Sequence, residues 1–210
     1  MGKGRLMKWE NDLVNDIRFG SVVDDIDHPI PELGLKPSSP PAEFTDANHS
    51  ALQQAIDRCV NKPKTFLEIG VCRNGQHSST HTIFKNLPSD GIYLGVDLDD
   101  KTFLDNKEKG IHTIKTSSSN YEEVVSKLKS LGVDKLDFIF IDGWHSINQV
   151  LLDWEYTNLL SDGGVVALHD TTAHPGPFFF VKFLNRSIWE VYPNLCPNDH
   201  GLGYCLKNQI

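Results

Sequence analysis

The stretch Leu136–His145, LDFIFIDGWH, decides the fold. Its apolar part is nearly continuous and rich in aromatic and β-branched residues, which is typical of a strand buried on both faces of a parallel sheet. The run ends abruptly in Asp142, Gly143, Trp144 and His145. Because open α/β sheets bind ligands at the carboxyl edge of their strands, we expect Asp142 and His145 to lie in a functional site.

A second segment has the same form. Gly163–Asp170, GGVVALHD, is a glycine turn and a short apolar strand that ends in His169 and Asp170. Apolar residues at helical spacing lie between the two segments, so the unit is predicted to be strand, helix, strand with a right-handed crossover. Such a unit would bring Asp142, His145, His169 and Asp170 to one site.

The remaining predicted elements continue this alternation. Helices are expected from Thr45 or Asp46, after the glycine loop as far as Leu87, and at 121–131 and 178–184; strands are expected at 65–71, 93–98, 111–115, 189–192 and 202–206. Alternating strands and helices predict an α/β, doubly wound, Rossmann-like sheet. Residues 1–44 carry several prolines and little periodicity, so we expect an irregular N-terminal arm or lid, followed by one domain at 45–210.

Composition narrows the possible partners. The net charge of −8 and the lack of a Lys/Arg-rich run argue against binding to nucleic acid or to an anionic membrane. The four cysteines form no CxxC pair, which favours free thiols in a reducing, cytoplasmic setting, although Cys196 and Cys205 could pair across a late loop. No apolar run is long enough to span a bilayer. A small-molecule substrate fits this composition, and a homo-oligomer is left open.

The loop after the first strand, Glu68–Gly75, has three candidate meanings. A P-loop is excluded because Gln76 and His77 replace the required Lys and Ser or Thr. A dinucleotide fingerprint is excluded because Cys72 replaces its middle glycine. What remains is a glycine turn suited to a nucleoside ligand that lacks a pyrophosphate.

Asp97 ends the second predicted strand. Its carboxylate has two oxygens and could accept both hydrogen bonds of a ribose diol. The alternative is a solvated aspartate in an acidic turn, but its position one strand after the glycine loop favours the ribose.

Four motifs in order carry a family resemblance. The motif E-x-G-x-x-x-x-G at 68–75, GVDLD at 95–99, FIDGWH at 140–145 and GGVVALHD at 163–170 together resemble class I S-adenosylmethionine-dependent methyltransferases over roughly residues 50–207. The IDGWH and HDT segments and HPGP at 174–177 resemble the metal-dependent O-methyltransferases of macrolide sugars and, more distantly, catechol O-methyltransferase. The resemblance implies a mostly parallel sheet with an antiparallel closing strand, and methyl transfer to a hydroxyl of a sugar or another small diol-bearing molecule.

The resemblance also implies roles for single residues. The cofactor would be bound at its methionine part by Glu68, Gly70 and Gly75 and at its ribose by Asp97. Ser117 and Ser118 would lie near the adenine, and Trp144 would lie beside the cofactor. A divalent metal, Mg²⁺ or Mn²⁺, would be held by Asp142 and Asp170, and we expect His169 as the third ligand. The catalytic residues would be Asp142 and the general base His145, whose imidazole can accept a proton near neutral pH.

His169 departs from the family pattern, which usually has an acidic residue at this position. An imidazole favours manganese, iron or zinc over magnesium, or serves only to orient Asp170. Two alternatives to the methyltransferase are therefore kept. One is a metal-dependent hydrolase or oxygenase that uses the Asp/His cluster, and the other is a catalytically inactive, methyltransferase-like binding protein.

Overall fold

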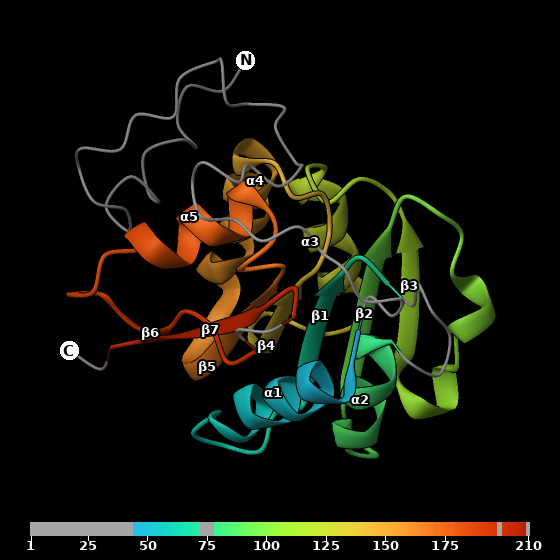
Figure 1. Ribbon diagram of the computed structural model, residues 1–210. Coiled ribbons are helices and arrows are strands. Elements are labelled where there is room, and N and C mark those ends of the chain that lie inside the picture. Colours follow the sequence, from blue (N-terminus) through green and yellow to red (C-terminus); the bar gives the residue numbers. More distant parts are fainter. Residues whose placement is uncertain (1–43, 72–77, 197–198, 209–210) are drawn as a thin grey trace.

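Seven strands form one mixed sheet in the order β3-β2-β1-β4-β5-β7-β6 (Figure 1). The computed structural model describes residues 44–71, 78–196 and 199–208. The strands are β1 Thr65–Ile69, β2 Ile92–Asp97, β3 Ile111–Lys115, β4 Leu136–Ile141, β5 Leu160–His169, β6 Trp189–Tyr192 and β7 Leu202–Lys207. Strands β1 to β5 pair in parallel, and β7 is antiparallel to both β5 and β6. This topology confirms the predicted Rossmann-like sheet with an antiparallel closing strand.

Helices cover both faces of the sheet (Figure 1). They are α1 Asp46–Asp57, α2 Ser79–Asn86, α3 Tyr121–Ser130, α4 Ile147–Trp154 and α5 Pro175–Phe183, with short 3₁₀ helices η5 Thr102–Leu104, η6 Lys107–Lys109 and η7 Glu155–Leu159. The apolar side chains of α1 and α2 pack with one face of the sheet, and those of α3, α4 and α5 with the other. The central strands are thus buried on both sides, as their continuous apolar sequences predicted.

The register places several strand ends at the same edge. Ile69 of β1 is paired with Ile141 of β4, and Ile141 is paired with Leu168 of β5. The residues that follow β1 and β4, and those that end β5, therefore meet at the carboxyl edge. Because β7 runs the other way and pairs Leu202 with His169, the residues that precede β7 also reach this edge.

The starts of two elements differ from the prediction by several residues. Helix α5 begins at Pro175, because proline is well suited to the first helical position, where no N–H is needed. Strand β5 begins at Leu160 and not at the glycine turn, since Leu160 pairs with Leu136 and a register shift in β4 accommodates the extra residues. The predicted start of α1 is confirmed, with the Thr45 side chain accepting a hydrogen bond as its N-cap.

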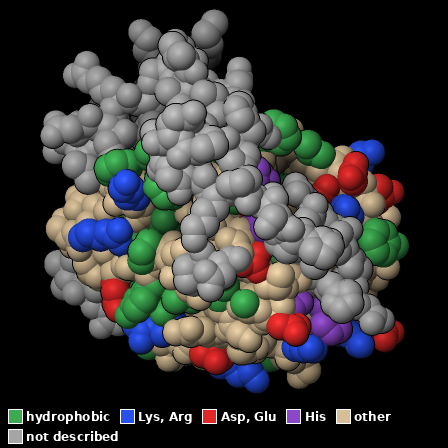
Figure 2. Space-filling view, viewed as in Figure 1, with side chains coloured by type: hydrophobic (Ala, Val, Ile, Leu, Met, Phe, Trp, Pro, Cys, Tyr) green, Lys and Arg blue, Asp and Glu red, His purple; other side chains and the backbone are tan. Residues whose placement is uncertain are grey.

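Surface charge, helix length and the cysteines can be compared with the predictions from composition. Figure 2 shows Lys and Arg side chains interspersed with Asp and Glu on the viewed face, with no large patch of one sign among the described residues. None of the helices in the described part of the chain has the length and apolar character needed to cross a membrane. Cys59, Cys196 and Cys205 are free thiols, so Cys196 and Cys205 do not pair. Residues 1–43 lie outside the described residues, and the predicted arm stays a prediction.

Candidate functional site

A cavity of about 340 Å³ lies at the carboxyl edge of the sheet. Five residues predicted to bind a cofactor line it: Gly70, Asp97, Ser117, Ser118 and Trp144. They come from the ends of three neighbouring strands and the segment after β4. The volume is within the range of about 300–1,000 Å³ that is usual for small-molecule sites.

Asp97 is held in position by backbone groups. Its Oδ2 accepts a hydrogen bond from the Val71 N–H at 2.8 Å, and its Oδ1 accepts one from the Asp99 N–H at 2.8 Å. The Lys101 ammonium lies 3.9 Å from the carboxylate. Each carboxylate oxygen can accept a further hydrogen bond, so a fixed pair of acceptors faces the cavity for a diol.

Gly70 brings the β1 loop against the segment that follows β4. Its φ is +83°, a left-handed conformation that glycine adopts without strain. A Cβ built on Gly70 would lie 2.0 Å from the backbone oxygen of Asp142, so no other residue fits here without a backbone shift. The cavity wall and the Asp142 segment are therefore in direct contact.

Glu68 is fully buried and bonded within the protein. Its carboxylate accepts hydrogen bonds from the hydroxyls of Ser79 at 2.5 Å, Thr80 at 2.8 Å and Tyr93. Burial raises the pKa of Glu68 to about 7, although these hydroxyls oppose the shift. Glu68 thus ties β1 to the first turn of α2 and is not one of the residues that line the cavity. Gly75 lies outside the described residues.

A second buried acid lies behind the cavity. The Gln149 side chain, which lines the cavity, donates hydrogen bonds to the Ser118 hydroxyl at 3.0 Å and to Asp153 Oδ1 at 2.8 Å. Burial raises the pKa of Asp153 to about 7. This chain of polar contacts fixes the Ser118 end of the cavity.

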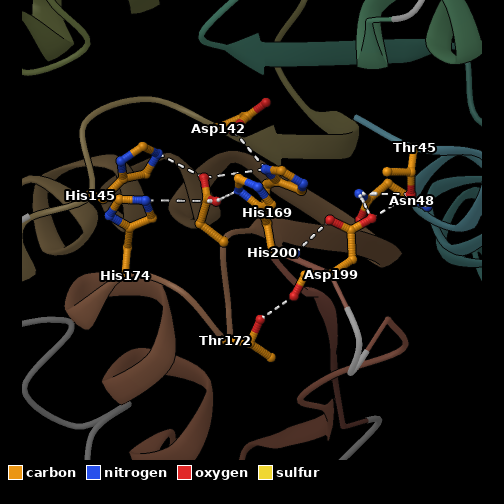
Figure 3. A network of polar contacts seen from close by, with 10 residues as sticks. Thr45, Asn48, Asp142, His145, His169, Thr172, His174, Asp199 and His200 are labelled. Carbon is orange, nitrogen blue, oxygen red and sulfur yellow. Dashed lines mark hydrogen bonds and ion pairs between the residues drawn. The ribbon is translucent and has the colours of Figure 1, made fainter. Parts of the chain in front are cut away.

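The predicted metal ligands converge next to this cavity. His169 Nδ1 lies 3.2 Å from Asp142 Oδ1 and 3.2 Å from Asp170 Oδ2 (Figure 3). One ligand atom from each of the three residues lies within 4.8 Å of the others. These atoms lie together because β4 and β5 are parallel neighbours that end at the same edge of the sheet.

Asp170 is the centre of a larger group of imidazoles. The Nε2 of His145 lies 2.8 Å from its Oδ2, the Nδ1 of His200 lies 3.0 Å from its Oδ1, and the Nε2 of His174 lies 4.0 Å from Oδ1. His200, in the segment that precedes β7, was missed by sequence reasoning. Asp170 also has a φ of +61°, the one non-glycine residue with positive φ in the described part of the chain. Such a backbone is uncommon and is often found at functional sites.

The charges in this cluster stabilise one another. Burial acts to lower the pKa of His169, but the carboxylates of Asp170 and Asp142 outweigh it, so this pKa lies well above its usual value. Burial acts to raise the pKa of Asp170, but His169, His145 and His200 outweigh it, so this pKa lies well below its usual range. The Asp170 carboxyl is therefore ionised, and His169 must lose its proton before its imidazole can bind a cation.

The donor set fits a divalent metal. Two carboxylates and one imidazole converge, with His169 Nδ1 facing both carboxylates. Nitrogen and oxygen ligands together suit Mn²⁺, Fe²⁺ or Zn²⁺ better than Mg²⁺, which prefers oxygen ligands. Asp142, His169 and Asp170 are thus a chemically consistent metal triad.

Comparisons with known proteins identify the family and the fold. A family model described as a methyltransferase domain matches residues 67–171. MycE methyltransferase of mycinamycin biosynthesis, solved in complex with Mg, SAH and mycinamycin VI, is 17% identical with a TM-score of 0.52. The match covers 77% of this chain and 49% of MycE, so the chain spans about half the length of that protein.

A second solved structure has the same fold. CalS11, a TDP-rhamnose 3′-O-methyltransferase of calicheamicin biosynthesis, is 14% identical with a TM-score of 0.56, covering 78% of this chain and 81% of CalS11. No curated protein sequence matches the chain. The family match includes both the glycine loop and Asp170, and the sheet has the strand order of class I methyltransferases. The chain therefore belongs to this methyltransferase domain family, with an S-adenosylmethionine-dependent methyltransferase fold.

Proposed function

We propose that the protein is an S-adenosylmethionine-dependent, metal-assisted O-methyltransferase that acts on a hydroxyl of a sugar or another small diol-bearing molecule. One observation carries the proposal: the cavity lined by Gly70 and Asp97 adjoins the Asp142–His169–Asp170 triad through the segment after β4. A nucleoside pocket and a cation site in contact are what metal-assisted methyl transfer requires. The sugar methyltransferase CalS11 and the Mg-bound MycE support the substrate class and the metal.

Different residues would bind the cofactor and the metal. Asp97 would bind the ribose hydroxyls, and Ser117, Ser118 and Trp144 would surround the rest of the nucleoside. S-adenosylmethionine supplies a methyl group on a sulfonium. A divalent cation held by Asp142, His169 and Asp170 would provide positive charge close to the acceptor oxygen and ease loss of its proton. Positioning of the acceptor by this cluster is itself a large part of catalysis.

His145 is the proposed general base. It lies at the mouth of the cluster, with its side chain 12% exposed and its Nε2 2.8 Å from Asp170 Oδ2. The His145 imidazole would take the acceptor proton on the ring nitrogen that does not face Asp170, as the acceptor oxygen gains the methyl group. The Asp170 carboxylate orients the ring and stabilises the imidazolium that forms.

The test is methyl transfer from S-adenosylmethionine to a panel of sugars and catechols, with Mg²⁺ or Mn²⁺ present. We expect product with the native protein and a drop of at least about 100-fold in kcat for His145→Gln and Asp142→Asn. His81→Gln, an exposed histidine of α2, is the matched control and should retain activity.

The alternatives predict other results. A protein that binds the cofactor but transfers no methyl group to any diol acceptor would favour the inactive binding protein. Metal-dependent turnover that does not require S-adenosylmethionine would favour the hydrolase or oxygenase. Either result would contradict the proposed function.

A further inference from the structure

His145, Asp170 and His174 form a second group of potential metal ligands. One atom from each of these residues lies within 4.8 Å of the others, as in the triad of Asp142, His169 and Asp170. Asp170 is the one residue that the two groups share. We propose that His145, Asp170 and His174 bind a second divalent cation, of the first-row transition-metal class.

The donor chemistry identifies the kind of cation. Two imidazoles and one carboxylate are the ligands of many zinc and iron sites, whereas Mg²⁺ and Ca²⁺ prefer oxygen. Ligand bonds to Zn²⁺ are about 2.0–2.2 Å, so two ligand atoms of one ion lie at most about 4.4 Å apart. The distances of 2.8 Å from His145 Nε2 to Asp170 Oδ2 and 4.0 Å from His174 Nε2 to Asp170 Oδ1 satisfy this limit.

The two imidazoles are held together by the backbone around them. Their rings stack with centroids 4.1 Å apart and planes at 28° (Figure 3). The Asp170 carbonyl accepts a hydrogen bond from the His174 N–H at 3.1 Å, and the His145 carbonyl accepts one from the Gly176 N–H at 2.9 Å. A Cβ on Gly176 would lie 2.4 Å from the His145 carbonyl oxygen, so only glycine allows this approach. The β4–α4 and β5–α5 loops are thereby fixed to each other.

The second group lies close to the protein surface. His145 Nε2 is buried and makes no hydrogen bond of good geometry with any described residue, although it lies near Asp170. The side chains of His145 and His174 are 12% and 18% exposed, so neither imidazole is fully enclosed by the protein. Asp170 belongs to both groups, so its carboxylate would be a ligand of both cations.

Occupancy of this second triad has a consequence for the proposed reaction. A cation bound to His145 Nε2 would hinder the imidazole from taking up a proton. This consequence rests on the proposed function, because it assumes that His145 is the base. A transition-metal ion in excess would then inhibit methyl transfer, while the first triad alone supports it.

The test counts bound metal without measuring turnover. Metal-free, full-length protein is titrated with Zn²⁺ in a calorimeter, with Mg²⁺ in a parallel titration. We expect two Zn²⁺ per chain for the native protein, one for His174→Gln, one for His145→Gln and one for Asp142→Asn. The control His81→Gln should still bind two. Asp170→Asn should weaken both sites by at least about tenfold, since it removes the shared charge.

The same titrations can also contradict the second cation site. If His174→Gln and His145→Gln, each confirmed folded by circular dichroism, bind as many Zn²⁺ as the native protein, the second site does not exist. Failure of the methyltransferase proposal would appear separately, as absent methyl transfer in metal-replete protein. The two proposals can therefore fail independently.

Discussion

The buried carboxyl of Glu68 should make the stability of the protein fall as pH rises. Its pKa of about 7, against an ordinary 4.5, means that the folded chain keeps this proton while the unfolded chain has already lost it. The free energy of unfolding therefore falls as pH rises from 4.5 to about 7, and above about pH 7 this group causes no further loss. The difference corresponds to about 3 kcal/mol of unfolding free energy.

Glu68→Gln removes this ionisation but keeps the size of the side chain. Urea unfolding should be measured at several pH values. The unfolding free energy of the mutant, relative to that of the native protein, should rise by about 3 kcal/mol between pH 4.5 and 8. Asp153→Asn is a second, independent test of the same reasoning, because burial also raises the pKa of Asp153 to about 7. The double mutant should show the sum of the two changes, since the residues share no hydrogen bond. A native-minus-mutant difference that does not vary with pH would refute the reasoning.

Three further predictions concern packing and the cavity. Gly176→Ala should lower the unfolding free energy by about 1–3 kcal/mol in urea titrations, because the added Cβ would lie 2.4 Å from the His145 carbonyl oxygen; unchanged stability would show that the loops are not fixed there. Trp144→Ala, at a cavity residue that is 56% exposed, should weaken S-adenosylhomocysteine binding in calorimetry while changing stability by less than about 0.5 kcal/mol. Trp154→Ala, at a fully buried position, should destabilise by about 3–5 kcal/mol in the same urea assay, and a much smaller loss would contradict the tight core.

Sequence reasoning was most effective at the ends of parallel strands. The strands that end before Asp142 and at His169 were recognisable from their continuous apolar runs, and parallel neighbours must end at a common edge. The same argument placed Gly70 and Asp97 together, and both line the cavity. The local hydrophobic pattern alone is thus enough to predict which residues lie at the carboxyl edge of a parallel sheet.

The long-range part of the site was not readable in this way. His200 precedes β7, and it reaches Asp170 because β7 reverses direction beside β5, a pairing that no local signal reveals. The hydroxyls that surround Glu68 come from α2 and β2, so the sequence could not show that its carboxylate is committed to them. His174 is the residue before the first turn of α5, and the Pro175 that follows it is a local signal of that position. Proline favours the first helical position and restricts the backbone of the residue before it.

The most direct test of the central claim is calorimetric titration of S-adenosylhomocysteine into the native protein and into Asp97→Ala. Asp162→Ala, an exposed aspartate in β5, serves as the matched control. We predict binding by the native protein and the control, and affinity at least about tenfold weaker for Asp97→Ala, because charge-assisted hydrogen bonds to the ribose are lost. Folded native protein that does not bind the ligand, or an Asp97→Ala variant that binds as tightly as the native protein, would contradict the account.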